Sequence, residues 1–119
     1  MGVPVIHGYF SSDFDPIDKW IPNDVSRVSI FIDVYLGPDI KPSGEYFTIN
    51  VVTNKMFECG VTVNKYQCVL DQYDWDSVKK WVGEVTAKCD GNNWAEMADK
   101  LSHFMLWEFQ SYSNHTRSS

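Results

Sequence analysis

The sequence changes its hydrophobic period once, and that change limits the folds open to it. Over residues 28–36 apolar side chains recur at every second position, which is the period of a half-buried strand. From Asp74 onwards they recur every three or four positions, which is the period of an amphipathic helix. Strands followed by helices predict an α+β fold, with the helices packed on one face of an antiparallel sheet.

Four to five strands are expected in the first part of the chain. Segments 28–36 and 45–53 both alternate and enclose the turn-rich stretch G-P-D-I-K-P-S-G, so they are interpreted as an antiparallel pair. The face of the first segment opposite its aliphatic residues holds Ser29, Phe31, Asp33 and Tyr35. The other strand candidates are 3–10, 61–63 and 66–70.

Two helices are predicted in the last third, each with a start signal. Asp74 is the expected N-cap of the first, and Gly91 is expected to end it as a C′ residue. Asn93 caps the second, with Glu96 at the capping-box position. The turn between the helices is short, so they are expected to be antiparallel neighbours. The second apolar stripe runs through Trp94, Met97, Ala98, Leu101, Phe104 or Met105, and Phe109.

Length and composition predict a single domain over residues 1–112, followed by a polar and disordered tail, 113–119. The longest apolar run, 104–107, is far short of the roughly 20 residues that span a bilayer. The N-terminal residues lack the pattern of a secretory signal. Three cysteines without a C-x-x-C pair favour a reduced, cytoplasmic setting over a disulfide framework or a zinc site.

Sixteen acidic and ten basic residues give a net charge of −6. This charge disfavours nucleic acid and anionic membranes as partners and favours basic proteins. A simpler interpretation is that the charge only keeps the protein soluble.

No catalytic residue, metal site or cofactor is predicted. The aspartates at 13–18 and 71–76 lie in turn-rich and helix-starting sequence, where capping explains them. Cys68 and Cys89 fit buried positions, and Cys59 is the one expected to be exposed. Three tryptophans on the helical stripes, Trp75, Trp81 and Trp94, are expected in the core. The run 104–107 is expected to be either enclosed or part of an interface.

Several motifs resemble, in their order and spacing, those of the immunity protein 8 family of bacterial polymorphic-toxin and contact-dependent-inhibition systems. The resemblance spans about residues 11–112, and the chain departs from it at T-N-K, where T-P-K is more usual. The motifs are S-S-D-F-D, I-P-N-D, L-G-P, G-E-Y-F-T-I-N-V, T-N-K, Y-D-W-D-S-V-K-K-W-V, C-D-G-N-N-W-A-E-M-A-D-K-L-S and W-E-F-Q-S-Y.

The resemblance implies a cytoplasmic antidote that binds a cognate toxin C-terminal domain and blocks it without catalysis. Many such toxin domains are basic nucleases, so a nuclease, and first a ribonuclease, is the expected target. From charge and expected exposure, acids in loops and strand edges are predicted to bind it, with two aromatic anchors. These residues are Asp13, Asp15, Asp18, Trp20, Asp24, Asp39, Tyr46 and Glu58.

Two alternatives stay open at this point. The chain could be a small α+β enzyme or ligand-binding domain whose cleft is invisible in the sequence. It could also be a scaffold that self-associates through the apolar run 104–107, and the expected state is a monomer or weak dimer.

Overall fold

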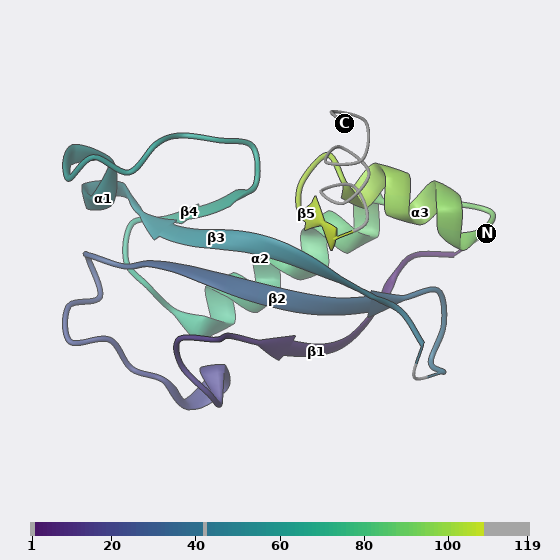
Figure 1. The fold of residues 1–119 in the computed structure, drawn as a ribbon, viewed down its shortest axis with the longest axis horizontal. Coiled ribbons are helices and arrows are strands. Elements are labelled where there is room, and N and C mark those ends of the chain that lie inside the picture. The colour runs from purple at the N-terminus through teal and green to yellow at the C-terminus, as the bar shows by residue number, and fades with distance from the viewer. Residues whose placement is uncertain (1, 42, 109–119) are drawn as a thin grey trace, which may run out of the picture.

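The computed structural model describes residues 2–41 and 43–108 and has the predicted α+β architecture, with a sheet on which two C-terminal helices pack (Figure 1). The strands are β1 (Val5–Phe10), β2 (Ser29–Gly37), β3 (Glu45–Thr53), β4 (Gln67–Leu70) and β5 (Leu106–Trp107). The helical segments are η1 (Ile17–Lys19), α1 (Asn54–Glu58), α2 (Trp75–Lys88) and α3 (Trp94–Leu101). The predicted tail at 113–119 lies outside the described residues.

The sheet is built on the predicted hairpin. β2 and β3 pair antiparallel, from Ser29 opposite Val52 to Leu36 opposite Glu45, and β1 adds antiparallel to β2. The other edge of β3 is shared: β4 runs parallel to its C-terminal part, and β5 runs antiparallel beside Phe47 and Thr48. β4 can be parallel because residues 54–66 carry the chain back across the sheet end before it begins.

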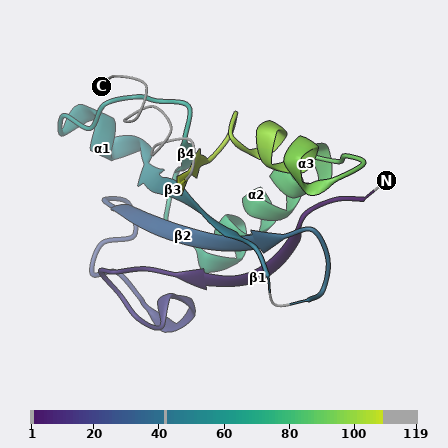
Figure 2. The ribbon, with the colours of Figure 1, turned by 45° about the vertical axis from the view of Figure 1, so that its right-hand side comes forward.

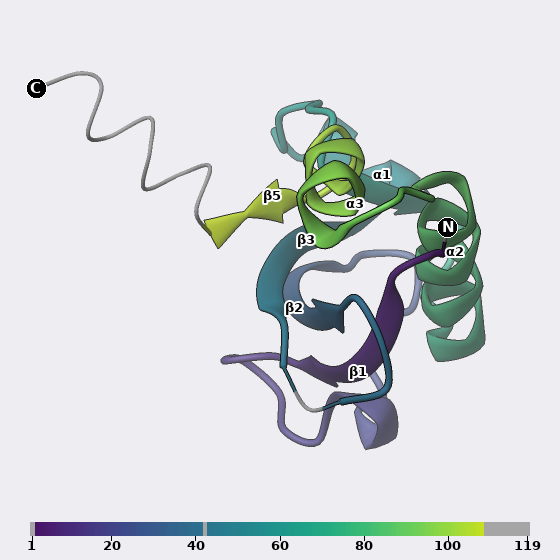
Figure 3. The same ribbon diagram turned by 90° about the vertical axis from the view of Figure 1, so that its right-hand side faces the viewer.

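One face of the sheet, here called the inner face, packs against the helices and forms the core. Alternate residues of β2 and β3 point into it, and Phe47 is its largest fully buried side chain. α2 contributes a buried stripe at Val78, Val82 and Val85, and α3 contributes Ala98 and Leu101. Figure 3 shows both helices on one side of the sheet. Burial of each such aliphatic side chain favours folding by roughly 1.5–3 kcal/mol over its exposure.

The predicted start signals of both helices are confirmed. The Asp74 side chain accepts a hydrogen bond from Ser77 N, and the Asn93 side chain accepts one from Glu96 N. The Glu96 carboxylate in return accepts from the backbone N of Asn92 at 3.0 Å. The bonds from Ser77 N and Glu96 N each satisfy an N–H group that a helix start leaves without an intrahelical partner, and the bond from Asn92 N ties the preceding turn to the helix.

The interpretation of Gly91 as a left-handed C′ residue is wrong. α2 ends at Lys88, and among the described glycines it is Gly60 that has a positive φ. Gly91 instead bridges to Gly2 through mutual backbone hydrogen bonds of 3.0 and 2.9 Å. A Cβ at Gly91 would lie 2.8 Å from the Glu96 Cβ, so close packing explains the glycine.

The second helix is shorter than its apolar stripe predicts. α3 ends at Leu101, a turn follows, and Leu106–Trp107 form β5 against β3. The Trp107 ring stacks on Phe47 with centroids 6.0 Å apart, and both the Trp107 and Trp94 indoles donate to the Glu45 carboxylate. Met105 is fully buried, so the run 104–107 is largely enclosed. Phe109, the predicted end of the stripe, lies outside the described residues.

Two short segments differ from the predicted strands. Residues 61–63 form no strand, and the chain after Thr53 forms the helix α1, which the sequence did not predict. Asn54, at the expected departure from the T-P-K motif, is the first residue of this helix. Proline suits that position because the first helical N–H needs no intrahelical partner.

Candidate protein-interaction surface

Five of the eight predicted interface residues lie in the connection between β1 and β2, residues 11–28, here called the acidic segment. Figure 2 shows it beside the same end of the sheet as α1. Ser11 Oγ donates to the carbonyl oxygen of Phe31 at 3.2 Å, which holds the start of the segment against β2. At its end, Thr53 Oγ1 accepts from Val28 N at 2.9 Å and donates to Ser26 O at 2.7 Å. The segment is therefore fixed to the sheet at both ends.

Trp20 lies at the centre of the acidic segment and is half-buried. Its ring stacks on Phe14 with centroids 4.1 Å apart, and it meets the edge of Tyr73 at 5.0 Å. The three rings pack against the core. The predicted anchor Trp20 is thus held rigidly and presents only part of its surface.

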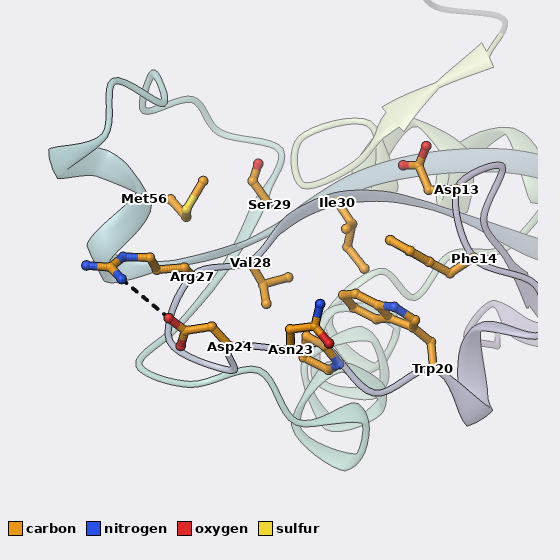
Figure 4. A pocket seen from close by; sticks show the side chains of 11 residues that line it. Asp13, Phe14, Trp20, Asn23, Asp24, Arg27, Val28, Ser29, Ile30 and Met56 are labelled. Atoms are coloured by element: carbon orange, nitrogen blue, oxygen red, sulfur yellow. Dashed lines mark hydrogen bonds and ion pairs between the residues drawn. The ribbon is translucent and has the colours of Figure 1, made fainter.

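A hollow of about 640 Å³ lies between the acidic segment and α1. Figure 4 shows Arg27 turned towards Asp24 on one side of it, with Phe14 and Trp20 on the other. Asp13 also lines it, together with apolar atoms of Val28, Ile30 and Met56. The hollow has an apolar wall and two carboxylates; Asp24 is already paired with Arg27 at 3.5 Å, so Asp13 is the carboxylate that suits a cationic side chain with an apolar stem.

Two of the predicted acids take part in turns. Asp24 accepts hydrogen bonds from Ser26 N at 2.9 Å and Ser26 Oγ at 2.6 Å, and Arg27 lies 3.5 Å away. The Ser26 side-chain hydrogen bond, with that of the Ser26 backbone, lowers the pKa of the Asp24 carboxyl. Asp39 accepts from Lys41 N at 2.9 Å in the β2–β3 connection. Turn formation therefore accounts for part of their bonding capacity.

The other acids of the segment are exposed and unpaired. Asp15 and Asp18 line a second hollow of about 450 Å³ with Tyr9, Trp75 and Lys79 among its walls. Within residues 2–41 and 43–108, no hydrogen bond or ion pair engages the side chains of Asp13, Asp15 or Asp18. Their carboxylates are therefore accessible to a partner.

The remaining three predicted residues lie on other elements, one of them on α1, which lines the larger hollow together with the acidic segment. Asp39 is in the β2–β3 connection, at the end of the sheet opposite α1 (Figure 1), and Glu58 ends α1. Tyr46 is 40% exposed on the face of β3 that points away from the core. The structure thus brings together five of the predicted residues and separates the other three.

Sequence reasoning did not assign a role to the neighbours of Tyr46 on that outer face. Phe31 is 58% exposed and Phe10 is 47% exposed, and both lie on the same face as Tyr46. Asp33 lies between them, opposite Phe10 on one side and Thr48 on the other. The signal was present: the alternation of 28–36 puts Phe31, Asp33 and Tyr35 together opposite the aliphatic face.

The comparison with protein families decides the relationship. The model of the family Immunity protein 8 matches residues 5–112, nearly the whole chain. The chain belongs to this family. Comparisons of this immunity protein with curated proteins and with solved structures found no match. An immunity protein acts against a toxin, so the family implies a toxin as its partner.

Three further structural findings concern metal binding, membrane-spanning helices and the cysteines of this immunity protein. In the part of the chain that the structure describes, no three His, Cys, Asp or Glu side chains are grouped so that they could hold a metal ion. In the same part, every helix is too short or too polar to cross a membrane. Among the cysteines, Cys59 is exposed and Cys68 and Cys89 are buried, as predicted.

Proposed function

We propose that this protein neutralises one cognate bacterial toxin domain by binding it in a stoichiometric, non-catalytic complex in the cytoplasm. The observation that carries the proposal is the match to the Immunity protein 8 family over residues 5–112. A further support is the acidic segment, which offers three unpaired carboxylates beside a rigid, half-buried tryptophan.

The chemistry of the segment favours a basic toxin surface. Asp13, Asp15 and Asp18 follow one another within six residues and add to a chain whose net charge is −6. Nucleases must bind a polyanion, so their active-site surfaces are basic, and a ribonuclease domain is the first target to test. Complementary charge of this kind raises association rates by about 10–1,000-fold at low ionic strength.

The separate positions can take different parts in such a complex. The unpaired acids Asp13, Asp15 and Asp18 supply long-range attraction. Asp24 and Trp20 line the larger hollow, where a lysine or arginine of the toxin would bury its stem. Asp39, Tyr46 and Glu58 would extend the contact beyond the segment. A toxin of ordinary interface size, about 800 Å² per partner, covers neighbouring elements as well as one loop.

The test is co-purification and protection with the toxin domain encoded immediately upstream of this chain. Wild type is expected to elute with that domain at 1:1 and to protect cells that express it. Absence of both the complex and the protection would overturn the proposed function.

A matched pair of triple variants tests the segment. Asp13→Asn with Asp15→Asn and Asp18→Asn is expected to slow association and to weaken its dependence on salt. The control, Asp76→Asn with Glu84→Gln and Asp99→Asn, removes the same charge from exposed positions on α2 and α3. Equal association rates for the two variants would assign the attraction to net charge alone and remove the segment from the interface.

A further inference from the structure

The outer face of the sheet carries a group of aromatic side chains from three strands, here called the outer aromatic face: Phe10, Phe31, Tyr35 and Tyr46. Tyr35 lies directly opposite Tyr46, with ring centroids 4.8 Å apart, and Phe10 meets Tyr46 at 6.0 Å. Single exposed apolar side chains are ordinary on a protein surface, but a group drawn from three strands is not.

Within residues 2–41 and 43–108, the chain covers the neighbouring half of the same face and leaves this half open. Asn50, opposite Phe31, is buried: its side chain accepts from Gln67 Nε2 at 3.0 Å, and Gln67 Nε2 also donates to Thr62 O at 2.9 Å. Segment 54–66 thus closes the face beside β4. A hollow of about 220 Å³ lies between Phe31, Tyr66 and Leu106, where the covered part of the face ends.

Among the described residues, the carboxylates on the open half are those of Asp33 and Glu108. Asp33 lies in its centre and is half-buried, and Glu108 lies at its edge, where its carboxylate accepts from Tyr46 N at 3.2 Å. The five described strands contain no lysine and no arginine. Thr48 Oγ1 donates to Asp33 Oδ1 at 2.6 Å, which leaves Oδ2 without a hydrogen bond within the described residues.

An aromatic surface around a partly desolvated carboxylate matches a specific kind of partner. A carboxylate that has lost part of its water binds a cation more strongly than an exposed one does. Arginine fits best, because its planar guanidinium can hydrogen-bond the free carboxylate oxygen while it lies on a phenol or phenyl ring. Binding energy in protein interfaces concentrates in such arginine and aromatic contacts.

We propose that the outer aromatic face docks directly on the toxin domain, with an arginine or lysine of the toxin over Asp33 and apolar toxin side chains on Phe31 and Phe10. The proposal rests on the proposed function, since the occupant is the toxin. It assigns the energetic centre of the complex to the sheet face and leaves the acidic segment, which continues from Phe10 at Ser11, to attract the partner.

Two single variants test the face by titration calorimetry with the purified toxin domain. Phe31→Ala removes an exposed ring and is expected to weaken binding at least tenfold. Asp33→Asn keeps an acceptor for the Thr48 hydroxyl and removes the charge, and it is expected to weaken binding about tenfold, with a smaller loss in high salt. The matched controls are Val3→Ala, whose side chain is 45% exposed next to the Gly2–Gly91 bridge, and Asp76→Asn on α2. Both controls are expected to bind as wild type does.

The outcomes separate this proposal from the one on which it rests. If wild type binds the toxin and both face variants bind equally well, the face is not the interface, while the proposed function stands. If wild type itself does not bind, both proposals fail. Sedimentation velocity provides a further check: a dimer of this chain that Phe31→Ala dissolves would mean that a second copy occupies the face, which would overturn the proposal.

Discussion

The two faces of β2 differ strongly in exposure, although they alternate residue by residue. Ile30, Ile32, Val34 and Leu36 point inwards and are at most 5% exposed. Phe31 and Asp33, one position away, point outwards to an open surface. Stability and binding are therefore assigned to alternate residues of the same strand. Substitutions at adjacent positions should separate the two properties.

The largest expected effect is on the inner face, at Phe47. Phe47→Ala would leave a cavity under α3 and is expected to lower the free energy of unfolding by about 3–5 kcal/mol. Its outer counterpart, Phe31→Ala, is expected to change it by less than about 0.5 kcal/mol, because 58% of that side chain is already exposed. Urea denaturation of both variants measures the difference. Equal losses would contradict the assignment of stability to one face.

The second largest loss of stability is expected at Glu45, at the end of the inner face. Its carboxylate accepts hydrogen bonds from the indoles of Trp94 and Trp107. Glu45→Ala removes both bonds and is expected to cost about 2–3 kcal/mol, since two partly buried donors lose their acceptor. Glu45→Gln keeps one carbonyl acceptor, so it is expected to lower the free energy of unfolding by less than Glu45→Ala does. Urea denaturation followed by tryptophan emission measures the stability of both variants. An unchanged stability of Glu45→Ala would show that the indoles find other acceptors.

Alkaline pH provides a third test, because the inner face buries a thiol. Burial raises the pKa of Cys68 to about 12 from its ordinary value of 9.0. Above pH 9 the unfolded chain loses this proton while the folded chain keeps it, so stability is expected to fall by up to about 1.4 kcal/mol per pH unit. Below pH 9 the thiol has no effect. Cys68→Ala is expected to flatten the profile between pH 9 and 12, and an identical profile would contradict this origin.

The smallest expected effect is a gain in stability, at Tyr73. Tyr73 is buried, and its hydroxyl has no hydrogen-bond partner within the described residues. Burial and the neighbouring Asp74 raise its pKa to about 12. Tyr73→Phe removes the unpaired hydroxyl and keeps the ring beside Trp20, so we expect a gain of up to about 1 kcal/mol. Thermal unfolding near pH 7 measures it, and a loss of stability would indicate a water bound to the hydroxyl.

The fold was predictable where the signals are local. The alternation of 45–53 gives the bounds of β3, and Asp74 and Asn93 cap their helices because capping depends on residues three positions away. The end of α3 was not predictable, since the apolar run 104–107 fits either period. Leu106 and Trp107 become a strand through distant contacts with Phe47 and Glu45.

The candidate surface was likewise predictable where the signals are local and not where distant contacts decide. The exposure of the acids in the acidic segment could be predicted from the sequence, because charged side chains in turn-rich sequence are nearly always exposed. The outer aromatic face could not be chosen, although its alternation is visible. Whether such a face is open depends on what covers it, and segment 54–66 covers Asn50 while leaving Phe31 in solvent.

The shared edge of β3 has a consequence for how the protein is made. Synthesis proceeds from the N-terminus, and the edge beside Phe47 and Thr48 has no strand partner until Leu106 and Trp107 have been added. At 5–20 residues per second, the interval between the completion of β3 and that of β5 is roughly 3–11 s. During that time the nascent chain exposes a free strand edge, which invites pairing with other chains. Synthesis of Leu106 and Trp107 closes this edge, so the sheet is complete only after β5 has been made.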